Sequence, residues 1–225
     1  MTTLDLNPEP AGRRERRRTE VHARIFEAAM RLFAKHGFFN TTVEQITEQA
    51  DVAKGTFFNY FPGKESILLA MAERQRAIVT SVTAKAADAP AVEPILRELG
   101  HRIAAMPAQS QIMLRSLLGV LFSYAELTVR MSELLQSGQE LIGQVMKRGQ
   151  DLGEIRADMA PRELARLFQQ TIFGNNALWG ILPPADVHEW MDRAIDVFWR
   201  GIATHPAPVR SQLSDSSGAN EERET

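Results

Sequence analysis

The chain has 225 residues, a formal net charge of −2 and 44% hydrophobic residues, which is enough apolar material for one small and one larger packed unit. It contains no cysteine, which excludes disulfide scaffolds, thiolate metal sites and cysteine nucleophiles and suits a reducing, cytoplasmic location. No apolar run reaches membrane-spanning length, and the polar, arginine-rich start predicts no secretory signal.

The first feature along the chain is the basic run RRERRRT at residues 13–19. Residues 11–64 carry ten basic and six acidic side chains, a net charge of +4, although the whole chain sums to −2. Positive charge is therefore concentrated at one end, as expected if only that end meets polyanionic DNA. We predict a flexible basic arm over residues 1–18. The run also fits a solvated tail, so a DNA contact by Arg17 and Arg18 is one of two interpretations.

Two helices are expected after this run. The first, of about four turns, ends at Gly37 and follows the apolar pattern Ile25, Ala28, Ala29, Leu32 and Phe33. The second has about two turns. Its start has two possible registers, because Thr41 with Glu44 and Thr42 with Gln45 both form a capping box. In this helix Val43, Ile46 and Ala50 are expected to face inward, and Gln45, Thr47, Glu48 and Gln49 outward.

A tight turn and a third helix follow. Asp51 tolerates the left-handed backbone that such a turn needs, so the third helix is expected to begin near Lys54. Its first turn combines a cation for phosphate, a glycine that permits close approach and Thr56, which can contact a base edge. Phe57 and Phe61 should return to the core. The candidate DNA-contacting residues are Arg17, Arg18, Thr42, Val43, Gln45, Ala53, Lys54, Gly55, Thr56, Phe58, Asn59, Tyr60 and Lys64.

This segment resembles the TetR family of bacterial transcriptional regulators. The family pattern is matched in order by Thr42, Ile46, Ala50, Val52, Gly55, Tyr60, Phe61, Lys64, Glu65 and Ile67. The resemblance implies a helix-turn-helix, a second domain that senses a small molecule, and a dimer interface made by the last two helices. Three positions depart from it: Phe58 replaces a phosphate-contacting tyrosine, Asp51 a turn glycine and Ala53 a serine cap.

The rest of the chain keeps a helical pattern, so the fold class is predicted to be all-α, with about nine helices. We expect the later helices at residues 64–87, 92–106, 110–129, 132–152, 162–180 and 186–204. The predicted domains are a helix-turn-helix unit over 19–64, a ligand-binding and dimerisation unit over 65–205, and a disordered tail over 206–225.

Broad apolar stripes mark the last two helices. Two interpretations remain open: the stripes form the interface of a homodimer, or they complete the core of one subunit. A dimer would place two recognition helices on successive faces of a palindromic operator. The candidate interface residues are Leu164, Phe168, Thr171, Trp190, Met191, Ala194, Ile195, Phe198 and Ile202.

The middle helices are candidates for a ligand site, because methionine and aromatic side chains suit an apolar or amphipathic small molecule. The same residue types also form ordinary cores. The asparagines at 175 and 176 lie in an apolar helix, where an unpaired amide is costly, so one of them could orient a ligand. The candidates are Met106, Met113, Leu117, Phe122, Phe168, Phe173, Asn175, Asn176 and Trp179.

An enzyme is the rival class. The best polar cluster is Glu189, Asp192 and Asp196, but opposite charges four residues along, at Arg193 and Arg200, explain these acids as surface ion pairs. We expect no catalytic residue, metal or cofactor. The residues, together with what the family resemblance implies about the direction of regulation, therefore predict a dimeric DNA-binding repressor released by a small molecule. The alternatives are a helical binding protein or enzyme with a vestigial DNA module, and a non-specific DNA binder.

Overall fold

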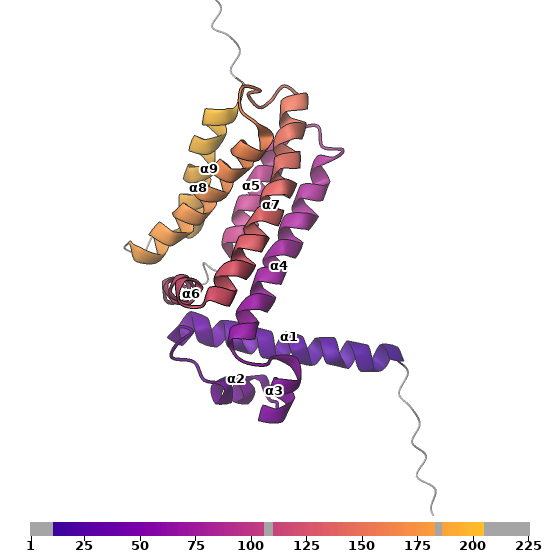
Figure 1. The fold of residues 1–225 in the computed structure, drawn as a ribbon, viewed down its shortest axis with the longest axis vertical. Helices are drawn as coiled ribbons and strands as arrows, with labels where there is room; N and C mark the ends of the chain where they lie inside the picture. Colours follow the sequence, from indigo (N-terminus) through magenta and orange to yellow (C-terminus); the bar gives the residue numbers. More distant parts are fainter. Residues whose placement is uncertain (1–10, 106–109, 183–185, 205–225) are drawn as a thin grey trace, which may run out of the picture.

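The computed structural model describes residues 11–105, 110–182 and 186–204, so Met106, residues 1–10 of the expected arm and the expected tail lie outside it. Across these ranges the chain forms nine α-helices and no strand, which confirms the all-α prediction. Figure 1 shows a small helical unit below a larger helical bundle. The helices are α1 (Ala11–His36), α2 (Val43–Ala50), α3 (Lys54–Tyr60), α4 (Glu65–Thr83), α5 (Glu93–Ala105), α6 (Gln111–Ser123), α7 (Ala125–Asp151), α8 (Pro161–Ile181) and α9 (Val187–Ile202), with a short 3-10 helix at Ala84–Ala86.

The first helix is longer than expected. It begins at Ala11, so residues 11–18, predicted to belong to a flexible arm, form its first two turns. Alanine, arginine and glutamate are favourable helix formers, and Thr19 donates a hydrogen bond to the Glu15 carbonyl (3.0 Å), although residues 12–20 are all exposed. The helix ends as predicted at Gly37, whose φ of 81° lies in the left-handed region.

The structure selects one of the two capping registers. Thr42 is the N-cap of α2: its hydroxyl accepts from the Gln45 N–H (3.2 Å), and its own N–H donates to Gln45 Oε1 (2.9 Å). Thr41 is buried and donates to the Gly37 carbonyl (2.8 Å). Thr47 is also buried, with its hydroxyl donating to the Glu44 carbonyl (2.9 Å), so the prediction that it faces solvent is wrong. A threonine hydroxyl that bonds within its own helix can be buried at little cost.

The turn between α2 and α3 has the expected geometry. Asp51 adopts φ 51° and ψ 56°, the left-handed conformation, and Val52 donates from its N–H to the Thr47 carbonyl (3.0 Å). Ile46 and Ala50 are buried, as the helical periodicity predicted.

The break between α6 and α7 differs from the prediction. We expected one helix over 110–129, but the chain turns by 105° at Tyr124, which is extended. Thr128 donates from Oγ1 to the Leu121 carbonyl (2.6 Å) and so satisfies one acceptor that the end of α6 leaves open. As a result α6 lies across the base of the bundle, where it is seen end-on in Figure 1.

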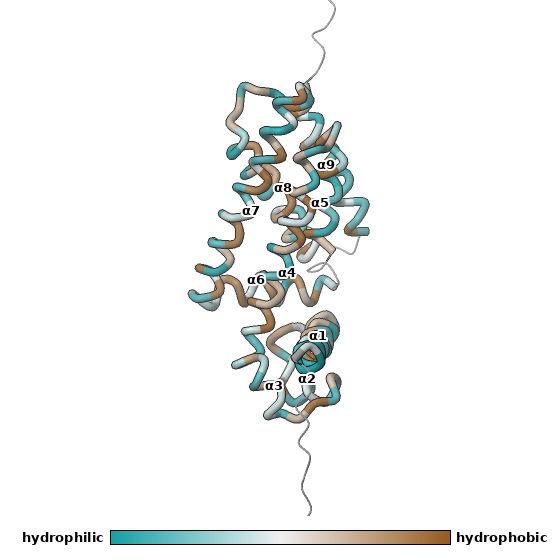
Figure 2. The backbone as a smooth tube through the Cα atoms, turned by 90° about the vertical axis from the view of Figure 1, so that its right-hand side faces the viewer, coloured by the Kyte–Doolittle hydropathy of each residue, from teal (hydrophilic) through white to brown (hydrophobic). Residues whose placement is uncertain are grey.

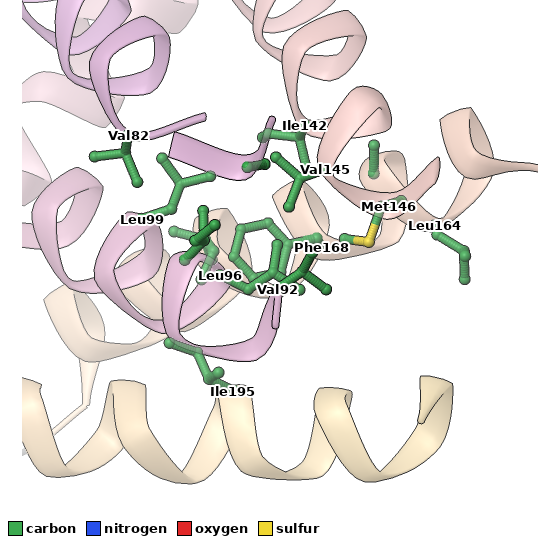
Figure 3. Packing of buried hydrophobic residues seen from close by; sticks show 14 of the residues in the cluster. Val82, Val92, Leu96, Leu99, Ile142, Val145, Met146, Leu164, Phe168 and Ile195 are labelled. Atoms are coloured by element: carbon green, nitrogen blue, oxygen red, sulfur yellow. The ribbon is translucent and has the colours of Figure 1, made fainter. Parts of the chain in front are cut away.

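Two apolar cores result from this arrangement. The upper core joins α4, α5, α7, α8 and α9, and Figure 3 shows Phe168 of α8 among Leu96 of α5 and Val145 of α7. The lower core joins α1, α2, α3 and the first turns of α4, and it includes Met113 and Val120 of α6. In Figure 2, which views α1 end-on, α2 and α3 lie beneath it and the bundle above. Side chains from beyond residue 64, the predicted domain boundary, therefore complete the lower core.

Several predicted interface residues belong to the upper core instead. At most 5% of each is exposed: Leu164, Phe168, Met191, Ile195 and Ile202. For the first four residues the interface prediction is wrong, because an apolar stripe on an amphipathic helix faces its own bundle first. Ile202 also lines a hollow on the outer surface of α8 and α9, so its interface role stays a prediction. The others, Thr171, Trp190, Ala194 and Phe198, are half-buried and reach the surface.

Among the described residues no single helix is long and apolar enough to cross a membrane. The bent pair of α6 and α7 meets the length and composition test only when the two are taken together.

Candidate DNA-binding surface and ligand cavity

The third helix has one buried face and one exposed face. Phe57 is 0% exposed and Phe61, directly after the helix, is 2% exposed, so these two rings anchor α3 in the lower core as predicted. Phe58 is 47% exposed, and Asn59 and Gly55 are exposed beside it. The exposed face of α3 thus carries an aromatic ring, an amide and a glycine.

Lys54 opens α3 and is exposed. Its ammonium pairs with the Glu44 carboxylate of α2, and this hydrogen bond holds the pKa of Glu44 below its usual value. Both side chains are more than half exposed, so the pair contributes little stability and can exchange for a phosphate.

Lys64, another candidate for contact with DNA, is bonded within the small unit rather than free at the surface. Its Nζ donates to the carbonyl oxygens of Phe38 and Thr41, both at 3.0 Å, and lies 4.5 Å from the Phe38 ring centroid. Two of its three N–H donors therefore act inside the small unit, which leaves one for a ligand.

The remaining DNA-contact candidates fall in three groups. Arg17 and Arg18 are exposed on the extended start of α1, which points away from the side of the molecule where α8 and α9 lie (Figure 1). Thr42 and Gln45 are exposed but bonded to each other, with half-buried Val43 between them. Ala53 is an exposed N-cap without a side-chain hydrogen bond, and Thr56 and Tyr60 are half-buried.

A cavity of about 200 Å³ lies inside the bundle, between α4, α5, α6, α7 and α8. Its wall is mostly aliphatic and rich in leucine. The polar side chains in the wall are Gln75, Arg76, Arg130, Gln169 and Asn176. A concave, largely apolar site with a few polar groups is the usual form of a small-molecule site.

The structure brings part of the predicted ligand set to this cavity. Leu117, Phe168, Phe173 and Asn176 line it. Leu117 comes from α6 and the other three from α8, so the helical periodicity of α8 was informative even though the cavity could not be located from it.

Other predicted ligand residues lie elsewhere. Met113 is fully buried in the lower core, and Phe122 is 76% exposed near the end of α6. Asn175 donates from Nδ2 to the Met191 sulfur at 4.0 Å, and Trp179 packs beside α6, where its carbonyl accepts from a glutamine (2.6 Å). These positions are wrong as cavity-lining residues, because their side chains leave α6 or α8 on other faces.

Sequence reasoning missed the contribution of α4 and α7. Gln75 and Arg76 come from α4 and Arg130 from α7. A signal was present: each is a polar residue next to the apolar stripe of its helix. The sequence does not show which helices surround a cavity, however, so such residues cannot be distinguished from ordinary surface residues.

The outer surfaces of α8 and α9 form a shallow hollow. It is lined by Leu167, Thr171, Val197, Phe198 and Gly201, among others. Val197 is 74% exposed, whereas Phe198 is half-buried with its ring 5.4 Å from that of Phe168. This surface is mostly apolar, although Arg156 and Gln170 also line it, and Val197 lies on its solvent side.

The acidic residues of α9 are held in ion pairs. Glu189 pairs with Arg193 as expected. Asp196 pairs with Arg97 of α5 (2.5 Å) rather than with the arginine four positions later, so that predicted partner is wrong. The packing of α5 along α9 supplies the nearer cation.

The family described as "Bacterial regulatory proteins, tetR family" matches residues 25–71. A 47-residue stretch, 21% of this chain, is 45% identical to the uncharacterised HTH-type transcriptional regulator YuxN of Bacillus subtilis (strain 168), and covers only 16% of that relative. The HTH-type transcriptional repressor DhaR of Mycobacterium sp. (strain GP1) is 30% identical over 156 residues, which are 66% of this chain and 76% of the relative.

Among solved structures, Thermus thermophilus FadR, a transcriptional repressor in complex with lauroyl-CoA, superposes with a TM-score of 0.56 and 28% identity. The match covers 83% of this chain and 97% of that one. The similarity thus extends from the small unit through the bundle. The chain belongs to the TetR family of bacterial transcriptional regulators.

Proposed function

We propose that this regulator represses transcription by binding a palindromic operator as a homodimer, and that a small, largely apolar molecule in the cavity releases it. One observation carries the proposal: the cavity and the lower core share side chains. Leu68 and Met71 of α4 and Val120 of α6 belong to the lower core and also line the cavity. A ligand there would touch the same residues that position the helix-turn-helix.

The coupling would run through α4 and α6. A ligand changes DNA affinity only if it binds one arrangement of these helices more tightly than another. Typical coupling free energies of about 1 to 3 kcal/mol correspond to a change of about 5- to 150-fold in operator affinity. The side chains that would move are buried and closely packed, so a ligand larger than the cavity of about 200 Å³ cannot enter without displacing some of them.

The DNA contacts would come mainly from α3. Thr56 and Asn59 are suited to base edges, and Lys54 to a phosphate. The start of α1 would add phosphate contacts through Arg17 and Arg18, outside the part of the operator that α3 reads.

The dimer would form through the hollow between α8 and α9. Its exposed Val197 joins two of the predicted interface residues, Phe198 and Thr171, which are half-buried there. Two-fold symmetry would then repeat the recognition helix and match a palindrome.

Lauroyl-CoA in the Thermus relative supports an effector with an apolar chain. Footprinting on DNA upstream of the protein's own gene, with and without such compounds, tests the proposal. Protection of one palindrome that competitor DNA does not abolish, and that a ligand weakens, is the expected result. Equal binding to all duplexes would instead identify a non-specific DNA binder, and no binding would leave a helical binding protein or enzyme.

A further inference from the structure

We propose that the effector is an amphipathic anion, whose negatively charged head lies between Arg76 and Arg130 and whose apolar body extends into the leucine-rich cavity. This inference rests on the proposed function and specifies the ligand of the same site. It depends on three features of the cavity wall: its charge, the pairing of its arginines and its buried amides.

The charge of the wall has one sign. Arg76 and Arg130 are the charged residues among the described side chains that line the cavity, and none of those side chains is acidic. The remaining polar groups are amides. A cationic head group would therefore meet like charge in the wall, since the carboxylates of Glu73 and Glu133 lie outside the wall and are already paired with the two arginines. An anionic head would meet two guanidinium groups.

The two arginines are placed at the solvent side of the cavity. The Arg76 side chain is 54% exposed and that of Arg130 is 60% exposed, although both belong to the wall. They come from α4 and α7, which lie side by side (Figure 1). A head group could thus stay hydrated on one side while the rest of the ligand is buried.

Each arginine now pairs with a glutamate one turn away on its own helix. Arg76 Nε lies 2.8 Å from Glu73, and an Arg130 terminal nitrogen lies 3.2 Å from Glu133. Exposed pairs of this kind contribute little stability, so a ligand carboxylate or phosphate can compete with them. An anion held by both arginines would also link α4, which leads to the helix-turn-helix, to α7.

The amides deeper in the wall define a second requirement. Asn176 is only 7% exposed, and its Oδ1 is buried without a hydrogen-bond partner among the described residues. Gln75 Oε1 is also buried without a partner among the described residues, although Gln75 Nε2 donates to the Ile103 carbonyl (3.1 Å). A buried acceptor without a partner is costly, so these oxygens can also accept a hydrogen bond from a donor on the ligand, a contact separate from the preference for an anionic head.

Calorimetric titration with three probes of equal chain length tests the charge preference. The probes are laurate, dodecan-1-ol and dodecyltrimethylammonium, each kept below its micelle-forming concentration. We expect laurate to bind about tenfold or more tightly than the alcohol, because charge-assisted hydrogen bonds are stronger than neutral ones, and the cation to bind weakest. The double variant Arg76→Gln, Arg130→Gln should bind laurate and the alcohol equally.

The matched control is Arg102→Gln, which removes an exposed, glutamate-paired arginine of α5 outside the cavity wall and should leave all three affinities unchanged. Equal binding of laurate and alcohol by the wild type, absence of laurate binding, or a preference that survives the double substitution would each overturn the inference. Operator footprinting on the same samples separates this from the proposed function: specific DNA binding without an anion preference refutes only the ligand assignment.

Discussion

Lys64, at the start of α4, donates from Nζ to the backbone carbonyl of Thr41 at 3.0 Å, and so ties the helix that leaves the DNA-binding unit to the loop that precedes α2. A second bond to the Phe38 carbonyl, also 3.0 Å, reinforces the link. Lys64, predicted to contact DNA, therefore also holds the unit together.

Replacing Lys64 with Met should destabilise the protein. The substitution keeps the length of the side chain but removes a charged donor from two part-buried carbonyls, so we expect a loss of about 1.5 to 3 kcal/mol in the free energy of unfolding. Urea denaturation measures it. Lys147→Met is the control, since that lysine is exposed and pairs with Asp151 on its own helix. An unchanged midpoint for Lys64→Met would show that the two bonds do not form in solution.

Replacing Lys54 with Ala should weaken binding to every DNA sequence to a similar degree. Each lost phosphate contact lowers the slope of log affinity against log salt by about 0.9, and fluorescence anisotropy at several salt concentrations measures that slope. Glu44→Gln should have the opposite effect on affinity, because it frees the Lys54 ammonium. Lys85→Ala, a change in the bundle, is the control. A loss confined to one operator would instead assign Lys54 to base recognition.

Replacing Val197 with Asp should produce monomers that bind the operator poorly. Val197 is 74% exposed in the hollow between α8 and α9, so a charge there leaves the subunit core intact but cannot be buried against a partner. Light scattering measures the mass. Val129→Asp, on the exposed surface of α7, should leave the mass unchanged. If Val197→Asp kept the wild-type mass, the dimer would have to form through another surface.

Replacing Asn176 with Leu should stabilise the ligand-free protein. Leucine has the same branched shape as asparagine but is larger, and the cavity that Asn176 lines can take the extra volume. The change removes a buried carbonyl oxygen that has no partner among the described residues, worth about 1 to 3 kcal/mol. Thermal unfolding should show a higher Tm. Destabilisation would mean that the Asn176 amide is already satisfied, for example by water in the cavity.

The stability of the DNA-binding unit should depend on His22 at mildly acidic pH. Burial, and then the positive charges of Arg74 and Arg18, lower the pKa of His22, so the folded protein binds its proton less readily than the unfolded chain does. The free energy of unfolding is therefore highest, as far as His22 is concerned, above the pKa of the unfolded chain, about 6.5. It decreases as the pH falls below that value, because the unfolded chain then binds the proton more readily. His22→Phe keeps a ring against Phe61 and removes the titration.

Urea midpoints of the wild type and His22→Phe at about pH 7.5 and about pH 5 give the measurement. The wild type should lose more stability than the variant between these values. Parallel losses would assign the acid sensitivity to carboxyl groups elsewhere in the protein.

Short-range features were readable from the sequence. The end of α1 at Gly37, the left-handed Asp51 and the inward rings of Phe57 and Phe61 were all predicted, because each depends on residues within one or two helical turns. The choice of Thr42 over Thr41 as the cap was not, since both satisfy the local pattern and only the burial of Thr41, whose hydroxyl donates to the Gly37 carbonyl, distinguishes them.

The same limit explains the predictions that failed. Met191 and Ile195 look like interface residues because an apolar stripe records only that a helix face is buried, not which surface covers it. Likewise Phe122 and Met113 share a helix with the cavity-lining Leu117 but point elsewhere.

The sequence alone thus determined the helical class, the recognition helix and the family, through caps, periodicity and fixed spacing along a single stretch of chain. Only the tertiary structure decided that α6 turns across the bundle, that Lys64 bonds inward, and that Arg76 and Asn176 meet at one cavity. These contacts join residues far apart in the chain. They depend on which helix faces pack together, and a local sequence pattern does not specify that packing.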